Sequence, residues 1–126
     1  MSTSRATGLS QNLRASTTPQ QAMTQFEVFA NPVARARSSY PFVVILQADV
    51  ARGGHERVVA PAAPRAAFPA VAGRLTPIMA IDRDEFVLLV TSVTTIPAQS
   101  LGRAIASLAH RRADILAAID YLFFGV

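Results

Sequence analysis

Apolar and polar residues alternate where the folded part of the chain begins. Phe26 and Val28 are apolar positions two residues apart, and residues 42–46, Phe-Val-Val-Ile-Leu, form a run rich in β-branched side chains. A period of two and β-branched runs are both typical of β-strands. Residues 31–39 between them carry turn formers and two arginines. We therefore expect two strands joined by an exposed loop.

Paired glycines predict a first hairpin. Gly53 and Gly54 lie between residues 46–48 and 58–60, and glycine supplies the positive φ angles of a tight connection. The Pro- and Ala-rich stretch 61–72 follows. Each proline removes a donor from a strand ladder, so we expect this stretch to be a crossover with one short helical turn and not a central strand.

A polar turn predicts a second hairpin. Residues 82–84, Asp-Arg-Asp, separate the apolar runs 78–81 and 86–90, as turn residues separate two strands. These acids and Glu85 are candidates for a carboxylate pair, but acids in a hairpin turn are typical turn formers and solvated charges. We assign them no catalytic role.

After Pro97 the apolar period changes from 2 towards 3.6, which predicts helices. We expect one short helix after Pro97, a turn near His110 and a final helix to about Phe123. About five short strands followed by a helix predict a mainly β (α+β) protein, a small, partly open antiparallel barrel with a C-terminal α-helix packed across it. The residues with helical spacing are Leu101, Ile105 and Leu108, then Ile115, Ile119, Leu122 and Phe123.

The first 24 residues differ in composition from the rest. They are rich in Ser, Thr, Gln, Ala and Arg and show no apolar period, which is typical of disorder. We expect residues 1–24 to be a disordered leader, or an upstream mis-start with translation beginning at Met23, and residues 25–126 to be a single domain. The chain has no secretory apolar segment and no run of about 18 apolar residues, so we expect a cytoplasmic protein without a membrane span.

The amino-acid composition excludes several kinds of functional site. With 51% hydrophobic and 16% charged residues and a net charge of +4, the chain has material for a packed core. No cysteine is present, which excludes disulfides, thiolate zinc sites and a cysteine nucleophile. Nucleic-acid-binding proteins often show a stripe of basic residues with aromatic residues between them. This sequence has no such stripe, so we do not expect it to bind nucleic acid. His110 has no second ligand at metal spacing, and we interpret it and His55 as structural or surface residues. We expect no catalytic residue, metal or cofactor.

Five local features in one order resemble the CcdB family of plasmid-addiction toxins. The last of them has a family-like Leu-x-His-Arg-x-x-Asp-Ile pattern and the matching spacing to an aromatic-Gly-aliphatic terminus. The resemblance covers residues 25–126. The features are Gln25-Phe26-Glu27-Val28, Leu46-Gln47-Ala48-Asp49, Arg57-Val58-Val59-Ala60-Pro61, Leu75-Thr76-Pro77-Ile78 and the C-terminal segment from Leu108-Ala109-His110-Arg111-Arg112-Ala113-Asp114-Ile115 to Leu122-Phe123-Phe124-Gly125-Val126. The passage from Ser92 to Pro97 also resembles a family passage that ends in Val-Pro.

The resemblance implies an SH3-like barrel that forms a homodimer. It also implies two partners, the A subunit of DNA gyrase and a short antitoxin with a disordered acidic tail. Such a toxin holds gyrase with its DNA cleaved and makes or breaks no bond itself, so it is an inhibitor of a topoisomerase and not an enzyme.

Carried over by position, the resemblance implies gyrase contacts at the end of the chain. Phe124, Gly125 and Val126 would bind gyrase, with Asp120, one helical turn earlier, and Val50 as supporting contacts. An exposed ring and an aliphatic tip suit a protein interface, and a glycine lets two backbones approach closely. Leu122 and Phe123 are interpreted as core or dimer-interface residues.

The sequence also offers two candidate antitoxin contacts, and it departs from the family pattern at three positions. Arg35 and Arg37 are candidate contacts for the acidic antitoxin tail, with a solvated loop as the alternative. Phe124 replaces the family's terminal Trp and so removes an indole donor and stacking area. Ala109 replaces a capping Ser, and Arg112 replaces an acid in the first helical turn, so we expect a less well capped helix.

Two other functions stay open. One is a ribonuclease toxin of the same barrel class, in which Arg, Thr and His groups would act as acid and base. The sequence shows no convergent set of such residues. The other is an inactive homologue that only binds antitoxin.

Overall fold

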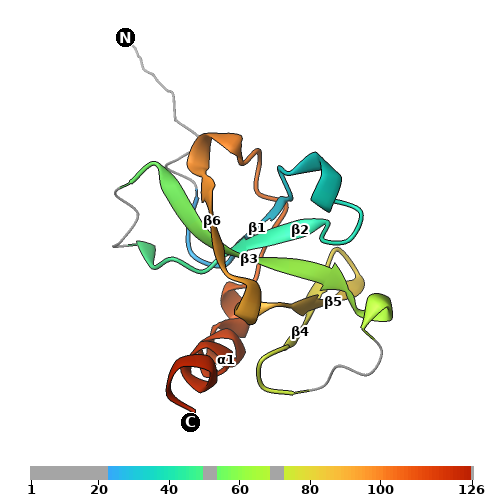
Figure 1. The fold of residues 1–126 in the computed structure, drawn as a ribbon, viewed down its shortest axis with the longest axis vertical. Helices are drawn as coiled ribbons and strands as arrows, with labels where there is room; N and C mark the ends of the chain where they lie inside the picture. The colour runs from blue at the N-terminus through green and yellow to red at the C-terminus, as the bar shows by residue number, and fades with distance from the viewer. Residues whose placement is uncertain (1–22, 50–53, 69–72, 126) are drawn as a thin grey trace.

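The computed structural model describes residues 23–49, 54–68 and 73–125. It shows a mainly antiparallel, nearly closed β-barrel with one C-terminal helix, which confirms the predicted fold class (Figure 1). Residues 1–22 of the predicted leader lie outside the described residues. Met23 lies inside them and is 2% exposed, packed in a hydrophobic core cluster.

The barrel is one antiparallel sheet with the strand order β4-β5-β3-β2-β1-β7, in which β6 also pairs with β3. About five strands were expected, and the described residues form seven, because two short strands, β6 and β7, add to the predicted set. The strands are β1 (Glu27–Ala30), β2 (Phe42–Ile45), β3 (Glu56–Pro64), β4 (Ile78–Ile81), β5 (Asp84–Leu88), β6 (Thr94–Pro97) and β7 (Ala106–Ser107).

The central strand β3 corrects one expectation, because it contains two of the prolines assigned to a crossover. Along one edge β3 pairs with β2, and along the other it pairs first with β6 and then with β5. The carbonyl of Pro61 accepts from Leu89 N at 3.0 Å, on the edge away from β2. Pro61 thus sits where β3 changes partners between Val59 and Ala62, and Pro64 ends the strand. Neither position requires a ladder donor.

The prediction of a short helix after Pro97 is wrong. Only a single 3-10 turn, η6 (Ala98–Ser100), forms there, and the chain continues to β7, which pairs with β1. Ile105 N donates to Val28 O at 2.7 Å, and Leu108 N donates to Phe26 O at 2.8 Å. Backbone pairing with the open edge of β1 therefore outweighs the helical spacing of the apolar residues in this segment.

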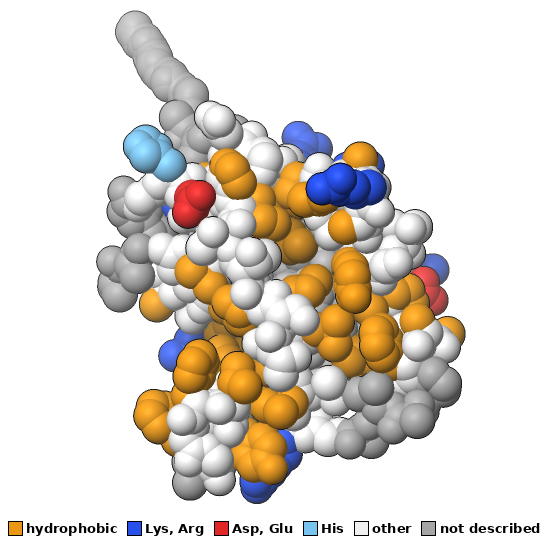
Figure 2. Space-filling model, in the orientation of Figure 1, with side chains coloured by type: hydrophobic (Ala, Val, Ile, Leu, Met, Phe, Trp, Pro, Cys, Tyr) orange, Lys and Arg blue, Asp and Glu red, His pale blue; other side chains and the backbone are white. Residues whose placement is uncertain are grey.

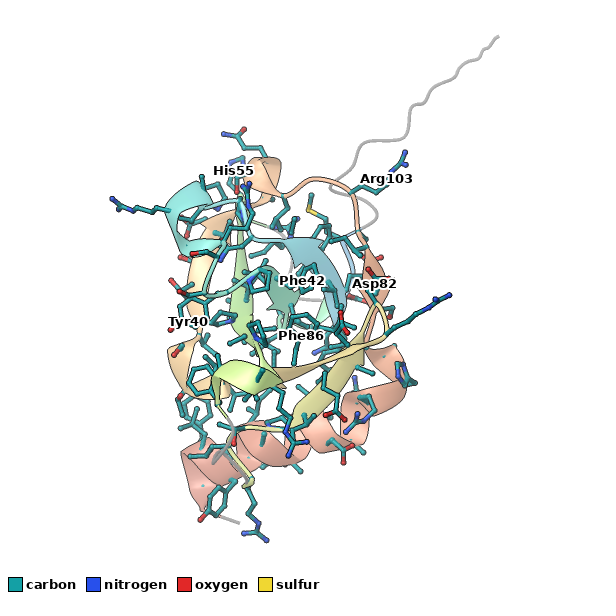
Figure 3. All side chains as sticks on the ribbon, turned by 90° about the vertical axis from the view of Figure 1, so that its right-hand side faces the viewer. Tyr40, Phe42, His55, Asp82, Phe86 and Arg103 are labelled. Carbon is teal, nitrogen blue, oxygen red and sulfur yellow. The ribbon has the colours of Figure 1, made fainter. Side chains whose placement is uncertain are left out.

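The final helix is confirmed. A 3-10 turn, η7 (Ala109–Arg111), leads directly into α1 (Arg112–Phe124). Side chains from α1 close the first of two main cores, which also contains Val44, while its neighbours Val43 and Ile45 point into the second. This alternation follows from the two-residue period of a strand. Figure 3 shows Phe42 and Phe86 facing one another in the interior, with ring centroids 5.0 Å apart.

The second predicted hairpin is confirmed, and its turn is tight. Ile81 pairs with Asp84, so Asp82 and Arg83 alone form the loop, at the edge of the barrel in Figure 3. Their φ angles are +51° and +74°. Two positive φ angles define a type I′ turn, which matches strand twist but favours Asn or Gly over a long side chain.

Replacing Arg83 by Gly is expected to stabilise the protein. A non-glycine residue in the left-handed region costs about 1–2 kcal/mol, and the greater chain entropy of glycine offsets part of that gain. We expect the free energy of unfolding to rise by about 0.5–1 kcal/mol, a shift in Tm of roughly 2–6 °C. Thermal denaturation measures it. The control is Arg83→Ala, which keeps the penalty; equal stabilisation by both variants would contradict the proposed backbone strain.

Candidate partner-binding site

The last turn of α1 exposes two adjacent aromatic rings. Phe123 is 70% exposed and Phe124 is 75% exposed, whereas Ile115 and Ala118 earlier in the helix are buried. Figure 1 shows the C-terminal end of α1 projecting beyond the strands, and Figure 2 shows hydrophobic side chains gathered over this end of the molecule. Large exposed rings cluster at protein interaction sites.

Helical geometry divides this end of α1 between two faces. Residues four apart are neighbours on a helix, and successive residues are about 100° apart. Asp120 and Phe124 therefore share one face, which we call the target face, together with Ala117 and Tyr121. Ile119, Leu122 and Phe123 belong to another face. The structure brings Asp120 and Phe124 together, as the predicted contact set requires.

An apolar groove lies beside the second face. It has a volume of about 260 Å³, and all of its described lining residues except Gln47 are apolar. Val93 stands at this groove with 42% exposure, beside Leu122 at 36%. Leu122 and Phe123 are therefore not core residues of the single chain. The lining residues are Leu46, Gln47, Val58, Val90, Val93, Ile119, Leu122 and Phe123.

Gly125 ends the helix. Its φ is +73°, in the left-handed region, and its N–H donates to Tyr121 O at 3.0 Å. A Cβ placed on Gly125 would meet nothing within 4 Å. Within the protomer the glycine is thus required for its backbone conformation as a helix C-cap, a role that the sequence pattern did not indicate.

Gly125→Ala is expected to weaken this cap. An alanine in the left-handed region costs about 1 kcal/mol, which should appear as a lower free energy of unfolding. Denaturant titration measures the loss. Gly102→Ala is the matched control, because Gly102 is exposed, has no positive φ, and has open space where an alanine methyl group would lie. Equal losses in both variants would contradict the capping role.

The start of α1 is held to the barrel by polar contacts. An Arg112 NH1 hydrogen bond reaches Gln25 Oε1 at 3.1 Å, and the Arg112 guanidinium lies 5.9 Å from the Phe26 ring centroid. Gln25 Nε2 in turn donates to Leu46 O at 2.9 Å. The arginine that departs from the family pattern therefore has a structural role, because it joins α1 to the turn at Gln25 that precedes β1. The Ala109 N–H is satisfied by Ser107 Oγ at 3.2 Å.

Arg35 and Arg37, the predicted contacts for the antitoxin tail, lie apart from the helix tip. Val50 and Val126 lie outside the described residues. Arg35 and Arg37 belong to the loop at η2 (Ala34–Ala36), at the opposite end of the molecule from the C-terminal turn of α1 (Figure 1). Both are exposed, and Arg37 Nε donates to Asn31 O at 2.8 Å.

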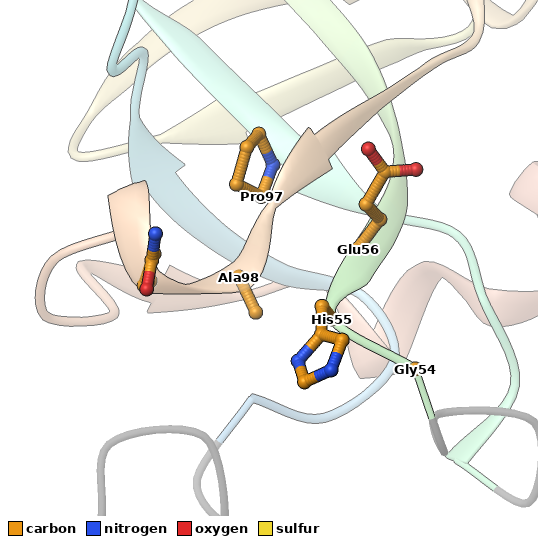
Figure 4. A pocket seen from close by; sticks show the side chains of 6 residues that line it. Gly54, His55, Glu56, Pro97 and Ala98 are labelled. Atoms are coloured by element: carbon orange, nitrogen blue, oxygen red, sulfur yellow. The ribbon is translucent and has the colours of Figure 1, made fainter.

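The described residues contain no group of three or more His, Cys, Asp or Glu that could hold a metal. His55 and His110 are both exposed. A hollow of about 330 Å³ lies beside His55, with Glu56 and Pro97 also on its wall (Figure 4). One imidazole and one carboxylate on an open surface do not form a nucleophile and base pair. Glu85, which was assigned to the hairpin turn, belongs to β5 and pairs with Arg65 at 3.2 Å.

In the part of the chain that the structure describes, no helix is both long and apolar enough to cross a bilayer. Residues 25–125 match the family model described as CcdB protein. This match covers the whole barrel and α1. Toxins of this family poison DNA gyrase and are not enzymes. Since the match spans most of the sequence, the chain belongs to the CcdB family.

Proposed function

We propose that this protein is the toxin of a toxin–antitoxin pair that binds the A subunit of DNA gyrase and traps its complex with cleaved DNA. The observation that carries the proposal is the exposed ring of Phe124, 75% accessible on the target face, in a chain that belongs to a family of gyrase poisons. Phe124, Gly125 and Val126 make the main contacts, and Asp120 and Val50 support them.

The exposed ring of Phe124 is better placed to stabilise a complex with a partner than to stabilise the fold. Phe124 contributes little to the core of a single chain, so its burial is available to a partner. Aromatic rings at the centre of an interface carry a large share of binding energy. Asp120, one turn earlier, adds a charge that fixes the orientation of the contact. No bond needs to be made or broken by these residues.

We also propose a homodimer in which the apolar groove forms the interface. In a two-fold interface the same surface patch meets itself, so Val93, Leu122 and Phe123 of each chain would enter the groove of the other. Their burial would remove the exposed apolar surface that a monomer carries. The target faces of the two helices lie on the side of α1 away from this interface, so the dimer would present one outward-facing copy of Phe124 on each chain.

A short antitoxin with an acidic tail neutralises the toxin in this proposal, and both act in the cytoplasm. Arg35 and Arg37 are candidate contacts for the tail, because both are exposed and arginine binds carboxylates through charge-assisted hydrogen bonds.

A gyrase cleavage assay tests the proposal. Supercoiled plasmid is incubated with gyrase and ATP, with and without this protein, and the DNA is released by detergent and protease. Linear DNA should accumulate only when the toxin is present. If a folded protein gives no linear DNA, the gyrase proposal is wrong. If the same preparation instead cuts purified RNA, the ribonuclease alternative is correct.

A further inference from the structure

Two polar side chains are buried in the part of the chain that the structure describes, and one of them is charged. They are Asn31 and Arg57, at 5% and 4% exposure. The Asn31 amide is satisfied, because its Nδ2 donates to Tyr40 O at 2.8 Å and its Oδ1 accepts from Val33 N at 3.0 Å. Burying an ionised group is costly unless it is paired. Arg57 therefore requires an explanation that Asn31 does not.

Backbone carbonyls hold the Arg57 guanidinium. Its NH1 donates to Gly54 O at 2.7 Å and to Glu56 O at 3.0 Å. Its Nε is buried and has no acceptor among the described residues. Within the same ranges of the chain, no Asp or Glu lies within ion-pair distance of Arg57. Carbonyl oxygens carry only partial charges, so they solvate the positive charge of Arg57 but do not neutralise it.

The hollow beside His55 lies against the same carbonyl groups. It has a volume of about 330 Å³, and Gly54 and Glu56 both form its wall. Because these two residues accept from Arg57, the guanidinium lies directly behind that wall. His55 and Gln99 also line the hollow, and an imidazole N–H and an amide NH2 group both donate hydrogen bonds. The hollow thus has side-chain donors at its surface and a buried positive charge beneath.

The acid on the wall does not cancel this charge on the His55 side. Figure 4 shows the Glu56 carboxylate and the His55 ring pointing to opposite sides of the chain. Glu56 is also exposed, and solvent and salt screen an exposed charge more than a buried one. Arg57 is therefore the stronger source of electrostatic potential on the His55 side of the hollow.

We infer that the hollow beside His55 binds a small oxyanion such as phosphate. The anion accepts hydrogen bonds from the His55 imidazole and the Gln99 amide and supplies the negative charge that Arg57 lacks. A ligand that binds only the folded chain stabilises it by mass action. This site does not depend on the proposed function, because Figure 3 shows His55 at the end of the barrel opposite α1.

An NMR titration of the full-length chain tests the inference. Inorganic phosphate is added at constant pH, with sodium chloride adjusted to keep the ionic strength constant. The chain has two histidines, and loss of one set of ring signals in His55→Ala assigns them. We expect the His55 ring signals to shift and to saturate at millimolar phosphate. The His110 signals are the internal control and should not follow the same curve.

Three variants test which residues bind the anion. Arg57→Met should weaken phosphate binding about tenfold, the size expected when a charged donor is lost. Gln99→Leu changes an exposed residue and should weaken binding about threefold. Arg103→Gln is the matched control, because Arg103 is an exposed arginine at the same end of the barrel as His55 (Figure 3). It should leave the affinity unchanged.

Several results would overturn the inference. One is a set of His55 signals that stays in place or moves no more than the His110 signals. Another is phosphate affinity that is unchanged in Arg57→Met, or that falls equally in Arg103→Gln, since the latter would indicate a response to net charge alone. If Arg57→Met does not fold, Gln99→Leu decides, and unchanged affinity in that variant would reject the site.

Discussion

Replacing Phe124 by Ala is expected to remove gyrase trapping and leave the fold intact. The ring is 75% exposed, so the free energy of unfolding should change by less than about 0.5 kcal/mol. As an aromatic anchor at an interface, it should contribute about 2 kcal/mol or more to gyrase binding, a loss of roughly 30-fold in affinity. The concentration of protein that gives half-maximal linear DNA measures this loss, and thermal denaturation checks the fold.

The neighbouring residue provides the control for this experiment. Phe123→Ala removes the same ring from a side chain of nearly equal exposure, at 70%, but on the face that borders the apolar groove. At concentrations that keep the protein dimeric, Phe123→Ala should retain gyrase trapping. If both variants lose trapping equally, the division of α1 into two faces is wrong. If neither loses it, the ring of Phe124 is not the anchor.

A carboxylate at Leu122 should dissociate the dimer. In the proposed interface, Leu122→Asp places an unpaired charge against the apolar groove, and burying such a charge costs several kcal/mol. We expect the dissociation constant of the dimer to rise by at least about 100-fold, which corresponds to roughly 2.7 kcal/mol. Sedimentation velocity over a concentration series measures the change.

Val33→Asp is the matched control, because Val33 is an exposed apolar residue at 45% in the loop at η2, away from the groove. It should leave the dimer unchanged. A Leu122→Asp protein that stays dimeric, or a Val33→Asp protein that dissociates as readily, would place the interface elsewhere.

The final helix and all the strands except β6 and β7 could be predicted because their signals are local. The continuous apolar run at residues 42–46 follows directly from a strand that is buried on both faces. The two errors arose where a partner elsewhere in the chain decides the outcome. Pro61 fits within β3 only because β3 changes neighbours at that point. Ile105 is not helical because the edge of β1 offers its backbone N–H a partner, the Val28 carbonyl.

The candidate site could be predicted only in part, because some of its residues are brought together by contacts between distant parts of the chain. Asp120 and Phe124 were found because the family resemblance carries them, and their spacing places them on one helix face. Val93 was not found, since an isolated valine in a polar stretch carries no signal until the fold sets it beside Leu122.

The anchored start of α1 restricts how the tail can change length. Ile115 and Ala118 fix the rotation of the helix against the barrel, and the contact between Arg112 and Gln25 fixes its beginning. Each residue inserted between the buried positions and the tip would rotate the tip by about 100°. A single insertion would swing the Phe124 ring out of the target face, whereas a complete turn would restore it. Homologous sequences should therefore vary in tail length by near-whole turns.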